Sequence, residues 1–571
     1  MRRLPASFVA LLLLVFLGAA PLSALAQTGD ESPRIGAPAP APIVPRGWAD
    51  AVDDAFGAIL VDPIAAVLYF DLIFWDGRGN ERDLQLPFIV FWLVLGATFF
   101  TLRMAFINVR GFRHAIEITL GKYDDPEEEG EVSHFQALSS ALSATVGLGN
   151  IAGVAIAVSV GGPGAVFWMV AAGFLGMTSK FTECTLGQMY RRVDERGRVL
   201  GGPMRYLKVG LDDLQEDLKG SLTEARLRRL FPFIPASVGP LGALGRGLAV
   251  LFSVMCIGGS FGGGNMFQAN QAFAQASRVI PWLEGKALLF GIVLAALVGI
   301  VIIGGIRRIG RVAETIVPFM CGIYVLAGLV ILVGNAPAVP AAFGTIVGSA
   351  FTLEAGFGGV LGTLITGFKR AAFSNEAGVG SASIAHSAAS TSEPVREGLV
   401  ALLEPFIDTL VVCTMTGLVV VVTGEYLNPS YAEGDSNIAG VSMTSAAFES
   451  VLPWFPYVLA LAVFLFAFST MVSWSYYGER AWSFLFGTGT SLVYKSMFLV
   501  FVVLGSILKL ANVTDFGDLM ILGMALPNIA GLFLLSGKVK GALDDYWARY
   551  SSGAMDDALA AAESTSEPAG E

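Results

Sequence analysis

Two glycine-rich stretches hold the polar groups best placed to bind an ion or a small solute in an otherwise apolar chain. They read Ala144-Thr-Val-Gly-Leu-Gly-Asn-Ile-Ala-Gly153 and Phe373-Ser-Asn-Glu-Ala-Gly-Val-Gly-Ser381. Glycine lets a helix unwind, and an unwound helix exposes carbonyls that can bind a cation and amides that can bind a carboxylate. Such backbone groups are tolerated at membrane depth only where protein or water covers them. Two breaks, one in each half of the chain, are typical of the site of a secondary transporter.

Polar side chains accompany the first stretch. Asn150 follows the glycine pair and can both donate and accept hydrogen bonds. Close packing of helices through small residues would also explain the glycines, but it does not require Asn150. Gln268 and Gln271 are three apart and share a helix face. They can bind a ligand or hydrogen bond to a neighbouring helix.

Hydroxyl groups and an indole occur together further along the chain. Ser469 and Thr470 offer adjacent oxygens suited to Na⁺ or an ammonium group, and Trp474 lies one turn later, where it can form the floor of a small apolar pocket. Alternatively, the hydroxyls bond back to carbonyls of their own helix and the indole packs as core.

Carboxylates also fall within apolar segments, where they are candidates for function. Asp408 lies deep enough to couple a proton or ion, or to act as a structural hydrogen-bonding group, whereas Glu404, four residues earlier, lies nearer the cytoplasmic end. Glu376 can pair with Lys369 or Arg370 and close the cytoplasmic side; alternatively, the two basic side chains lie at the interface and snorkel.

A second expected pair lies in another span. Lys180 and Glu183 are three residues apart near the inner end of that span, and a structural ion pair between them is expected.

Composition indicates a membrane protein and argues against several other classes. The 571 residues have a mean hydropathy of +0.65 and only 15% are charged, against about 25% in soluble domains. No basic face that could bind nucleic acid is apparent. The net charge of −11 says little about partners, because the acidic residues are concentrated in tails and loops. The four cysteines and three histidines have no metal-site spacing, and no nucleophile–base pair indicates an enzyme. An ion channel remains the rival class, although the polar residues gather at one depth rather than along a stripe.

The apolar runs predict an all-α polytopic protein with about eleven transmembrane helices. The predicted spans are 86–107, 135–160, 163–187, 243–275, 285–304, 312–333, 353–386, 397–423, 443–475, 490–509 and 516–536. Lys and Arg concentrate in 103–122, 188–230 and 307–311, while 334–352 and 424–441 have none. Basic loops stay in the cytoplasm, so we expect the mature N-terminus outside and the C-terminus inside.

Four regions follow along the chain. A basic start, an apolar run from Phe8 to Leu17 and Ala24-Leu-Ala26 predict a signal peptide over 1–26; an uncleaved helix is the alternative. Residues 27–85 are expected to form an extracytoplasmic linker and interfacial segment, and 86–536 the transporter domain. Residues 537–571 are expected to be a cytoplasmic tail that frays from about 540.

Several long motifs resemble the alanine or glycine:cation symporter family. They are Phe135-Gln-Ala-Leu138, the run Thr145 to Gly153, Gly161-Gly-Pro-Gly-Ala165 with Lys180, Gly367-Phe-Lys-Arg370, Phe373-Ser-Asn-Glu-Ala-Gly378, Ile384-Ala-His386 and Phe406-Ile-Asp-Thr-Leu410. The resemblance implies a bacterial or archaeal inner-membrane symporter that takes up alanine, glycine or similar amino acids with Na⁺, less often H⁺. It also implies the five-plus-five inverted repeat of the amino acid-polyamine-organocation superfamily, with two broken helices.

The resemblance further implies a site and its ligands. Gly149, Asn150 and Gln268 would receive the substrate's carboxylate and amine, and the pocket would be walled by Phe373, Thr470 and Trp474. No cofactor is expected. Sodium, as the coupling ion, would bind between the first break and a hydroxyl pair on a later helix, through Ala144, Thr145, Gly147, Ser469 and Thr470. The family often has Thr at Leu148, and the signal-like N-terminus is another departure. Symport of another amino acid, or coupling to protons, remains an alternative.

Overall fold

A computed structural model describes residues 86–555, with 126–127, 196, 304, 353–358, 433–435 and most of 222–238 omitted. A few positions between 56 and 69, and residue 557, are also described. The expected signal peptide and most of the expected linker lie outside the described residues.

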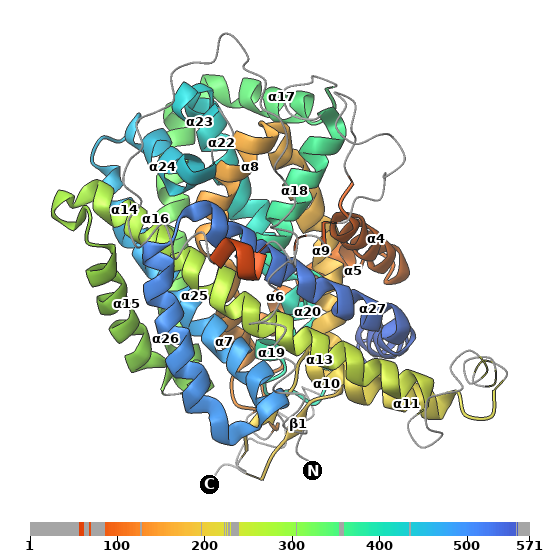
Figure 1. Ribbon diagram of the computed structural model, residues 1–571. Coiled ribbons are helices and arrows are strands. Elements are labelled where there is room, and N and C mark those ends of the chain that lie inside the picture. Colours follow the sequence, from red (N-terminus) through yellow and green to blue (C-terminus); the bar gives the residue numbers. More distant parts are fainter. Residues whose placement is uncertain are drawn as a thin grey trace, which may run out of the picture.

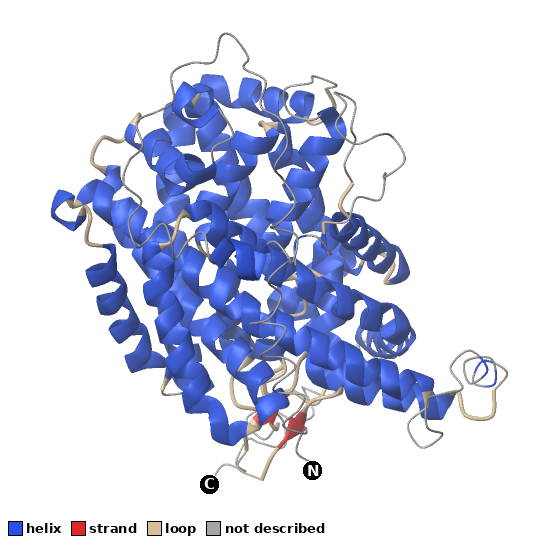
Figure 2. Ribbon diagram, in the orientation of Figure 1, coloured by secondary structure: helices blue, strands red, loops and turns tan. Residues whose placement is uncertain are grey.

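The described chain is almost entirely helical, and a short two-stranded hairpin lies at one end of the bundle (Figures 1 and 2). The described residues contain seven helices long and apolar enough to cross a membrane, or eight if one bent pair counts as a span. The longer helical segments are α9 (Gly164–Met189), α13 (Pro240–Phe261) continuing through η4 (Gly262–Met266) and α14 (Phe267–Val279), α16 (Gly305–Gly334), α25 (Phe455–Phe486), α26 (Ser491–Ile507) and α27 (Leu510–Ser551).

Shorter elements complete the bundle. They are η1 (Gly57–Val61), α4 (Phe88–Arg103), α5 (Ile107–Arg110), α6 (Phe112–Thr119), β1 (Arg192–Val193), β2 (Val199–Leu200), α10 (Pro203–Arg205), η3 (Tyr206–Gly210), α11 (Leu211–Asp217), η5 (Pro281–Leu283), α15 (Ala287–Ile302), η6 (Ala336–Ala338), α17 (Val339–Ser349), α20 (Pro394–Ala401), α21 (Leu403–Pro405), η8 (Phe406–Cys413), α22 (Thr414–Thr423), η9 (Glu425–Leu427), α23 (Pro429–Ala432), α24 (Ser436–Glu449) and η10 (Thr488–Thr490).

The first glycine stretch breaks its helix, as predicted. Helix α7 (His134–Thr145) ends just before the glycine pair, and η2 (Gly149–Gly153) and α8 (Val154–Gly161) continue at an angle of 51°. Ser133 starts α7 with a capping box, in which its hydroxyl accepts from the Gln136 amide and the Gln136 side chain accepts from the Ser133 amide.

The second glycine stretch also interrupts a helix. Helix α18 (Gly359–Asn375) stops at Asn375, and the short α19 (Ala382–His386) follows after six residues. Glu376 has a φ of 55°, and Gly378 and Gly380 have φ values of 80° and 98°. This left-handed backbone suits glycine, so the two glycines are needed for the chain to turn here. The breaks lie in the second and seventh predicted spans, five spans apart, as a five-plus-five repeat requires.

Helices occupy all eleven predicted segments, but two boundary predictions are wrong. The segment 443–475 holds the end of α24 and the start of α25, because Pro453 and Pro456 stop one helix and begin the next. The fraying predicted from about 540 does not occur, since α27 runs to Ser551. Its end is held by tertiary contacts that include a 2.8 Å hydrogen bond between the Tyr546 hydroxyl and His114 Nε2.

Candidate functional site

The first break is opened by two side chains that accept backbone hydrogen bonds. Gly147 N donates to Asn150 Oδ1 at 2.8 Å, and Leu148 N donates to Gln268 Oε1 at 3.3 Å. In a continuous α-helix these amides would donate to the carbonyls four residues earlier, at Ser143 and Ala144. The break therefore releases two neighbouring carbonyl oxygens in the protein interior.

One released carbonyl, that of Ser143, contacts the Thr470 hydroxyl on α25. The Thr470 hydroxyl donates to the Ser143 carbonyl at 3.1 Å, and the Ser143 hydroxyl donates to the Ser469 carbonyl at 2.9 Å. A Cβ atom at Gly147 would lie 2.5 Å from Thr470 Oγ1, so only glycine permits this approach. Oxygen atoms of this kind are the ligands that hard cations prefer.

The predicted cation ligands differ in how they are placed. Thr470 reaches the first break, whereas the Ser469 hydroxyl donates to Phe466 of its own helix at 3.0 Å. The Thr145 hydroxyl also bonds back within its helix, to Ala141 at 3.2 Å. The sequence did not lead us to assign Ser143 to this site, although the residue lies one helical turn before Gly147.

The second break lies directly against the first. A Cβ atom at Gly149 would lie 3.3 Å from Ser374 Cα and 3.6 Å from Phe373 Cδ1. The Phe373 ring packs edge-on to Phe267, with centroids 5.2 Å apart, and a Cβ atom at Gly263 would lie 2.9 Å from it. Phe373 thus forms a wall between the first break and η4.

The two glutamines separate in role. Gln268 bridges two helices, because its Oε1 accepts from Leu148 N and its Nε2 donates to the Gly263 carbonyl at 2.9 Å. Gln271 instead accepts from Val441 N at 2.9 Å and so joins α14 to α24. Only Gln268 therefore reaches the first break.

Asp408 in η8 ties both breaks together. Asn150 Nδ2 donates to Asp408 Oδ1 at 2.6 Å, while the Ser374 and Thr409 hydroxyls donate to Oδ2 at 2.9 and 2.7 Å. Asn150 comes from the first break and Ser374 from the second. The carboxylate is fully buried and is surrounded by donors, so Asn150 and Asp408 hold the breaks in place.

Trp474 contacts the second break from α25. Its Nε1 donates to Glu376 Oε1 at 3.0 Å, and the other Glu376 oxygen accepts from the Ser381 hydroxyl. The ring fills the space beside Gly264, where a Cβ atom would lie 2.3 Å from Trp474 Cγ. Trp474 therefore sits one turn beyond Thr470 and braces the turn around Glu376.

The ion pair expected between Glu376 and Lys369 or Arg370 is wrong. Lys369 Nζ lies 3.0 Å from Asp518 Oδ2, and Arg370 also pairs with Asp518, at the start of α27. Lys180 and Glu183 do approach each other, at 3.9 Å, but Lys180 is closer to Glu404, at 3.0 Å. The sequence could not reveal Asp518 as a partner, because the two segments are about 150 residues apart in the chain.

The side chains at the centre of the protein pack against one another. All of the predicted binding residues are buried: Ala144, Thr145, Gly147, Gly149, Asn150, Gln268, Phe373, Ser469, Thr470 and Trp474. Two small cavities lie elsewhere, one beside Asn375 and Ala377 and the other beside Gly162 and Thr363. Among the described residues, no group of three His, Cys, Asp or Glu side chains is placed to hold a metal ion.

Comparison with known proteins identifies the relatives of this chain. Residues 80–560 match the model of the sodium:alanine symporter family. The sodium/alanine symporter AgcS of Methanococcus maripaludis is 40% identical over 79% of this chain and 92% of its own length. The amino-acid carrier protein AlsT of Bacillus subtilis is 35% identical, over 80% and 89%. A third relative, the "Probable sodium/glutamine symporter GlnT" of the same bacterium, is 33% identical, over 84% and 91%.

The Asn150 contacts lead to a prediction about stability. Asn150→Ala removes the acceptor for Gly147 N and a donor to the buried Asp408 carboxylate, and unpaired buried groups cost about 1–3 kcal/mol each. We expect a clear loss of thermal stability in detergent. Asn335→Ala is the control, because Asn335 Nδ2 donates only locally, to Ile331 at 2.9 Å. Equal melting temperatures for the two variants would contradict the role given to Asn150.

Proposed function

The chain belongs to the sodium:alanine symporter family, and we propose that it imports alanine, glycine or a similar small neutral amino acid together with Na⁺. The chain is a transporter rather than an enzyme, as the family is. The observation that carries the proposal is the meeting of two broken helices. At the first break, the released Ser143 carbonyl accepts from the Thr470 hydroxyl and the Leu148 amide donates to Gln268.

Sodium is proposed to bind between the first break and α25. Its ligands would be carbonyls from Ser143 through Gly147, including Ala144 and Thr145, together with the Thr470 hydroxyl and Ser469. The Thr470 hydroxyl already donates to the Ser143 carbonyl. A cation between these two oxygens would replace that hydrogen bond, because both atoms can turn a lone pair toward it.

The substrate carboxylate is proposed to bind the amides of Leu148 and Gly149. Gln268 Oε1 now accepts from Leu148 N, so an arriving carboxylate would take over the position of this oxygen. The displaced Gln268 would remain near the bound amino acid. Asn150 would act as a positioning residue, since both ends of its amide already hold the break open.

Side-chain size is proposed to be limited by Phe373 and Trp474. Phe373 leaves little space beside Gly149, and Trp474 closes the region one turn past Thr470. This arrangement suits alanine or glycine. The relative named for glutamine shows why another amino acid stays the alternative substrate.

Na⁺ binding and amino acid binding are proposed to be coupled because both ligands use the first break. Sodium uses the carbonyls and the carboxylate uses the amides of the same unwound segment, so each ligand favours the conformation that binds the other. Such coupling is reciprocal. The mature N-terminus is proposed to lie outside the inner membrane and the C-terminus in the cytoplasm. Movement of one Na⁺ inward across the membrane potential supplies about 2.3 kcal/mol per 100 mV. Alternating access would proceed by rocking of a bundle around the closed centre.

The sodium site is tested by replacing the hydroxyl. In proteoliposomes, labelled alanine uptake should require an inward Na⁺ gradient, and Thr470→Ala should raise the half-saturating Na⁺ concentration at least about tenfold, or about 1.4 kcal/mol. Thr423→Ala is the control, because Thr423 bonds only to carbonyls of its own helix. An unchanged Na⁺ dependence in Thr470→Ala would refute the site, and uptake driven equally by H⁺ alone would refute sodium coupling. If folded protein took up neither alanine nor glycine in any gradient, the substrate assignment would fail.

The proposed carboxylate site is tested by replacing the glutamine side chain with a glutamate, which has the same size but carries a negative charge. Gln268→Glu should raise the KM for alanine at least about tenfold, since a second carboxylate would repel the substrate. Gln271→Glu adds the same charge on the same helix but away from the first break, and its oxygen still accepts from Val441 N. Similar KM changes in both variants would argue against substrate binding at Leu148 and Gly149.

A further inference from the structure

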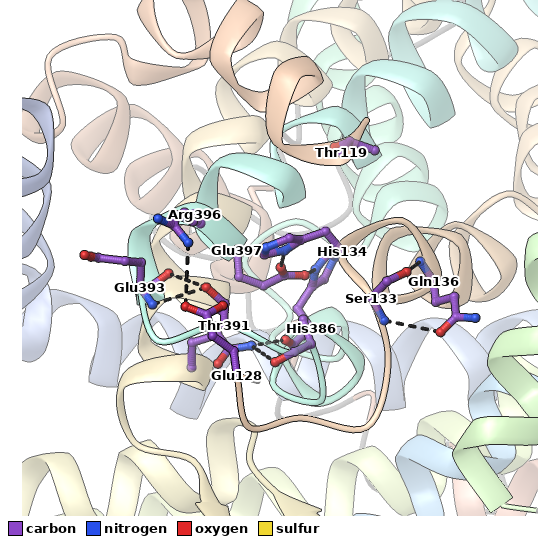
Figure 3. A network of polar contacts seen from close by, with 12 residues as sticks. Thr119, Glu128, Ser133, His134, Gln136, His386, Thr391, Glu393, Arg396 and Glu397 are labelled. Carbon is purple, nitrogen blue, oxygen red and sulfur yellow. Dashed lines mark hydrogen bonds and ion pairs between the residues drawn. The ribbon is translucent and has the colours of Figure 1, made fainter. Parts of the chain in front are cut away.

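A second polar cluster lies away from the central site and joins two histidines through one carboxylate. His134 Nδ1 hydrogen bonds to Glu397 Oε2, and His386 Nδ1 lies 2.6 Å from Glu397 Oε1. Figure 3 shows both rings directed at this carboxylate, beside the Ser133–Gln136 capping box. All three side chains are at most 1% exposed.

The cluster also includes an ion pair between Lys180 of α9 and Glu404 of α21. Glu404 Oε1 accepts from Lys180 Nζ at 3.0 Å, and Glu183 Oε1 lies 3.9 Å from the same nitrogen. The other Glu183 oxygen accepts from Asn528 Nδ2 at 3.0 Å. Lys180, Glu183 and Glu404 are fully buried.

Two acceptor atoms of the cluster face each other. His386 Nε2 lies 3.7 Å from Glu404 Oε2. Within the described part of the chain, neither atom has a hydrogen-bond partner. Because an ionised carboxylate only accepts, each histidine presents Nδ1–H to Glu397 and keeps a lone pair on Nε2. A proton on His386 Nε2 would convert this contact into a charge-assisted hydrogen bond to Glu404.

The charges of the cluster also favour an added proton. Three buried carboxylates, Glu183, Glu397 and Glu404, share one lysine when both histidines are neutral. Uncompensated buried charge is costly. A cation on His386 would lie between Glu397 and Glu404 and reduce the imbalance.

Other titratable and charged groups adjoin the cluster. Glu376 and Cys184 lie near Lys180, and Arg191 donates to the carbonyls of Ser387 and Ala389. Beyond His134 are Asp124 and Arg396, and Arg396 Nη1 lies 3.7 Å from Glu128. Tyr206 and Tyr477 are the neighbouring phenols.

We propose that His386 and Glu404 form a proton-binding site that latches the cytoplasmic ends of both broken helices. His134 begins α7 and His386 ends α19, so the cluster holds one end of each broken helix to α20 and α21. The proposal rests on the proposed transport function, because it assigns these ends to the gate that opens inward. Proton binding keeps the gate closed, and proton loss to the cytoplasm lets it open.

The direction of the pH effect follows from this latch. Lowering the internal pH keeps His386 protonated and the inner gate closed, so uptake slows. One proton can change the ratio of two states by at most about tenfold per pH unit. The sequence has three histidines, so the titrating ring can be identified by single replacements.

The test is sodium-driven uptake of labelled alanine into proteoliposomes, with external pH held constant and internal pH varied from about 6 to about 10, a range that covers the titration of a histidine placed between two carboxylates. In the wild type, uptake should increase severalfold with internal pH. His386→Gln should flatten this profile. His114→Gln is the matched control and should keep it, since His114 lies outside the cluster and bonds to Tyr546.

Hydrogen–deuterium exchange provides a readout that does not require transport. Exchange over 382–392, corrected for its intrinsic pH dependence, should be slower at about pH 6 than at about pH 10 in the wild type. Glu404→Gln should give slow exchange at both pH values, because the amide can donate to His386 Nε2 and still accept from Lys180. This second variant keeps the test decisive if His386→Gln does not fold.

The outcomes separate the two proposals. Alanine uptake with the same internal-pH profile in the wild type, His386→Gln and His114→Gln, or pH-independent exchange in the wild type, would overturn the proton site and leave the symporter standing. No alanine or glycine uptake at any pH, with pH-dependent exchange that Glu404→Gln abolishes, would support the proton site while overturning the proposed transport function.

Discussion

The central constraint in this protein is the diversion of two backbone amides from their own helix. Gly147 N and Leu148 N donate to Asn150 and Gln268, so the carbonyls of Ser143 and Ala144 lose their usual donors. An unpaired backbone group at membrane depth costs several kcal/mol. The break therefore depends on two side chains that satisfy its amides, Asn150 within the break and Gln268 from α14.

Those side chains are themselves held by a network that crosses both halves of the chain. Asn150 depends on Asp408, and Asp408 also accepts from Ser374 at the second break. Glycines make the close approach possible, because a Cβ atom at Gly147 or Gly263 would collide with Thr470 or Phe373. Packed contacts and hydrogen bonds consequently join the two breaks directly.

The sequence revealed the features that depend on local chemistry. Glycine pairs predicted both breaks, and the apolar runs located helices in all eleven segments. Pro453 indicates a helix boundary inside 443–475, but the segment is apolar on both sides of it, so the hydropathy pattern predicted one continuous span. Features set by distant contacts were not predictable. Asp518, the partner of Lys369 and Arg370, lies about 150 positions away from them. The extension of α27 depends on the contact between Tyr546 and His114, which belong to different helices. The side chain of Asn150 was expected at the substrate, but its partners are in the backbone and in η8.

The most direct test of the account is reciprocity of binding in the purified protein. The Kd for alanine should be measured with and without Na⁺, and the Kd for Na⁺ with and without alanine. If both ligands use the same diverted segment, each should strengthen the other's binding, and linkage requires the two factors to be equal. An alanine Kd that does not change with Na⁺ would contradict the claim that the released carbonyls and the exposed amides act as one site.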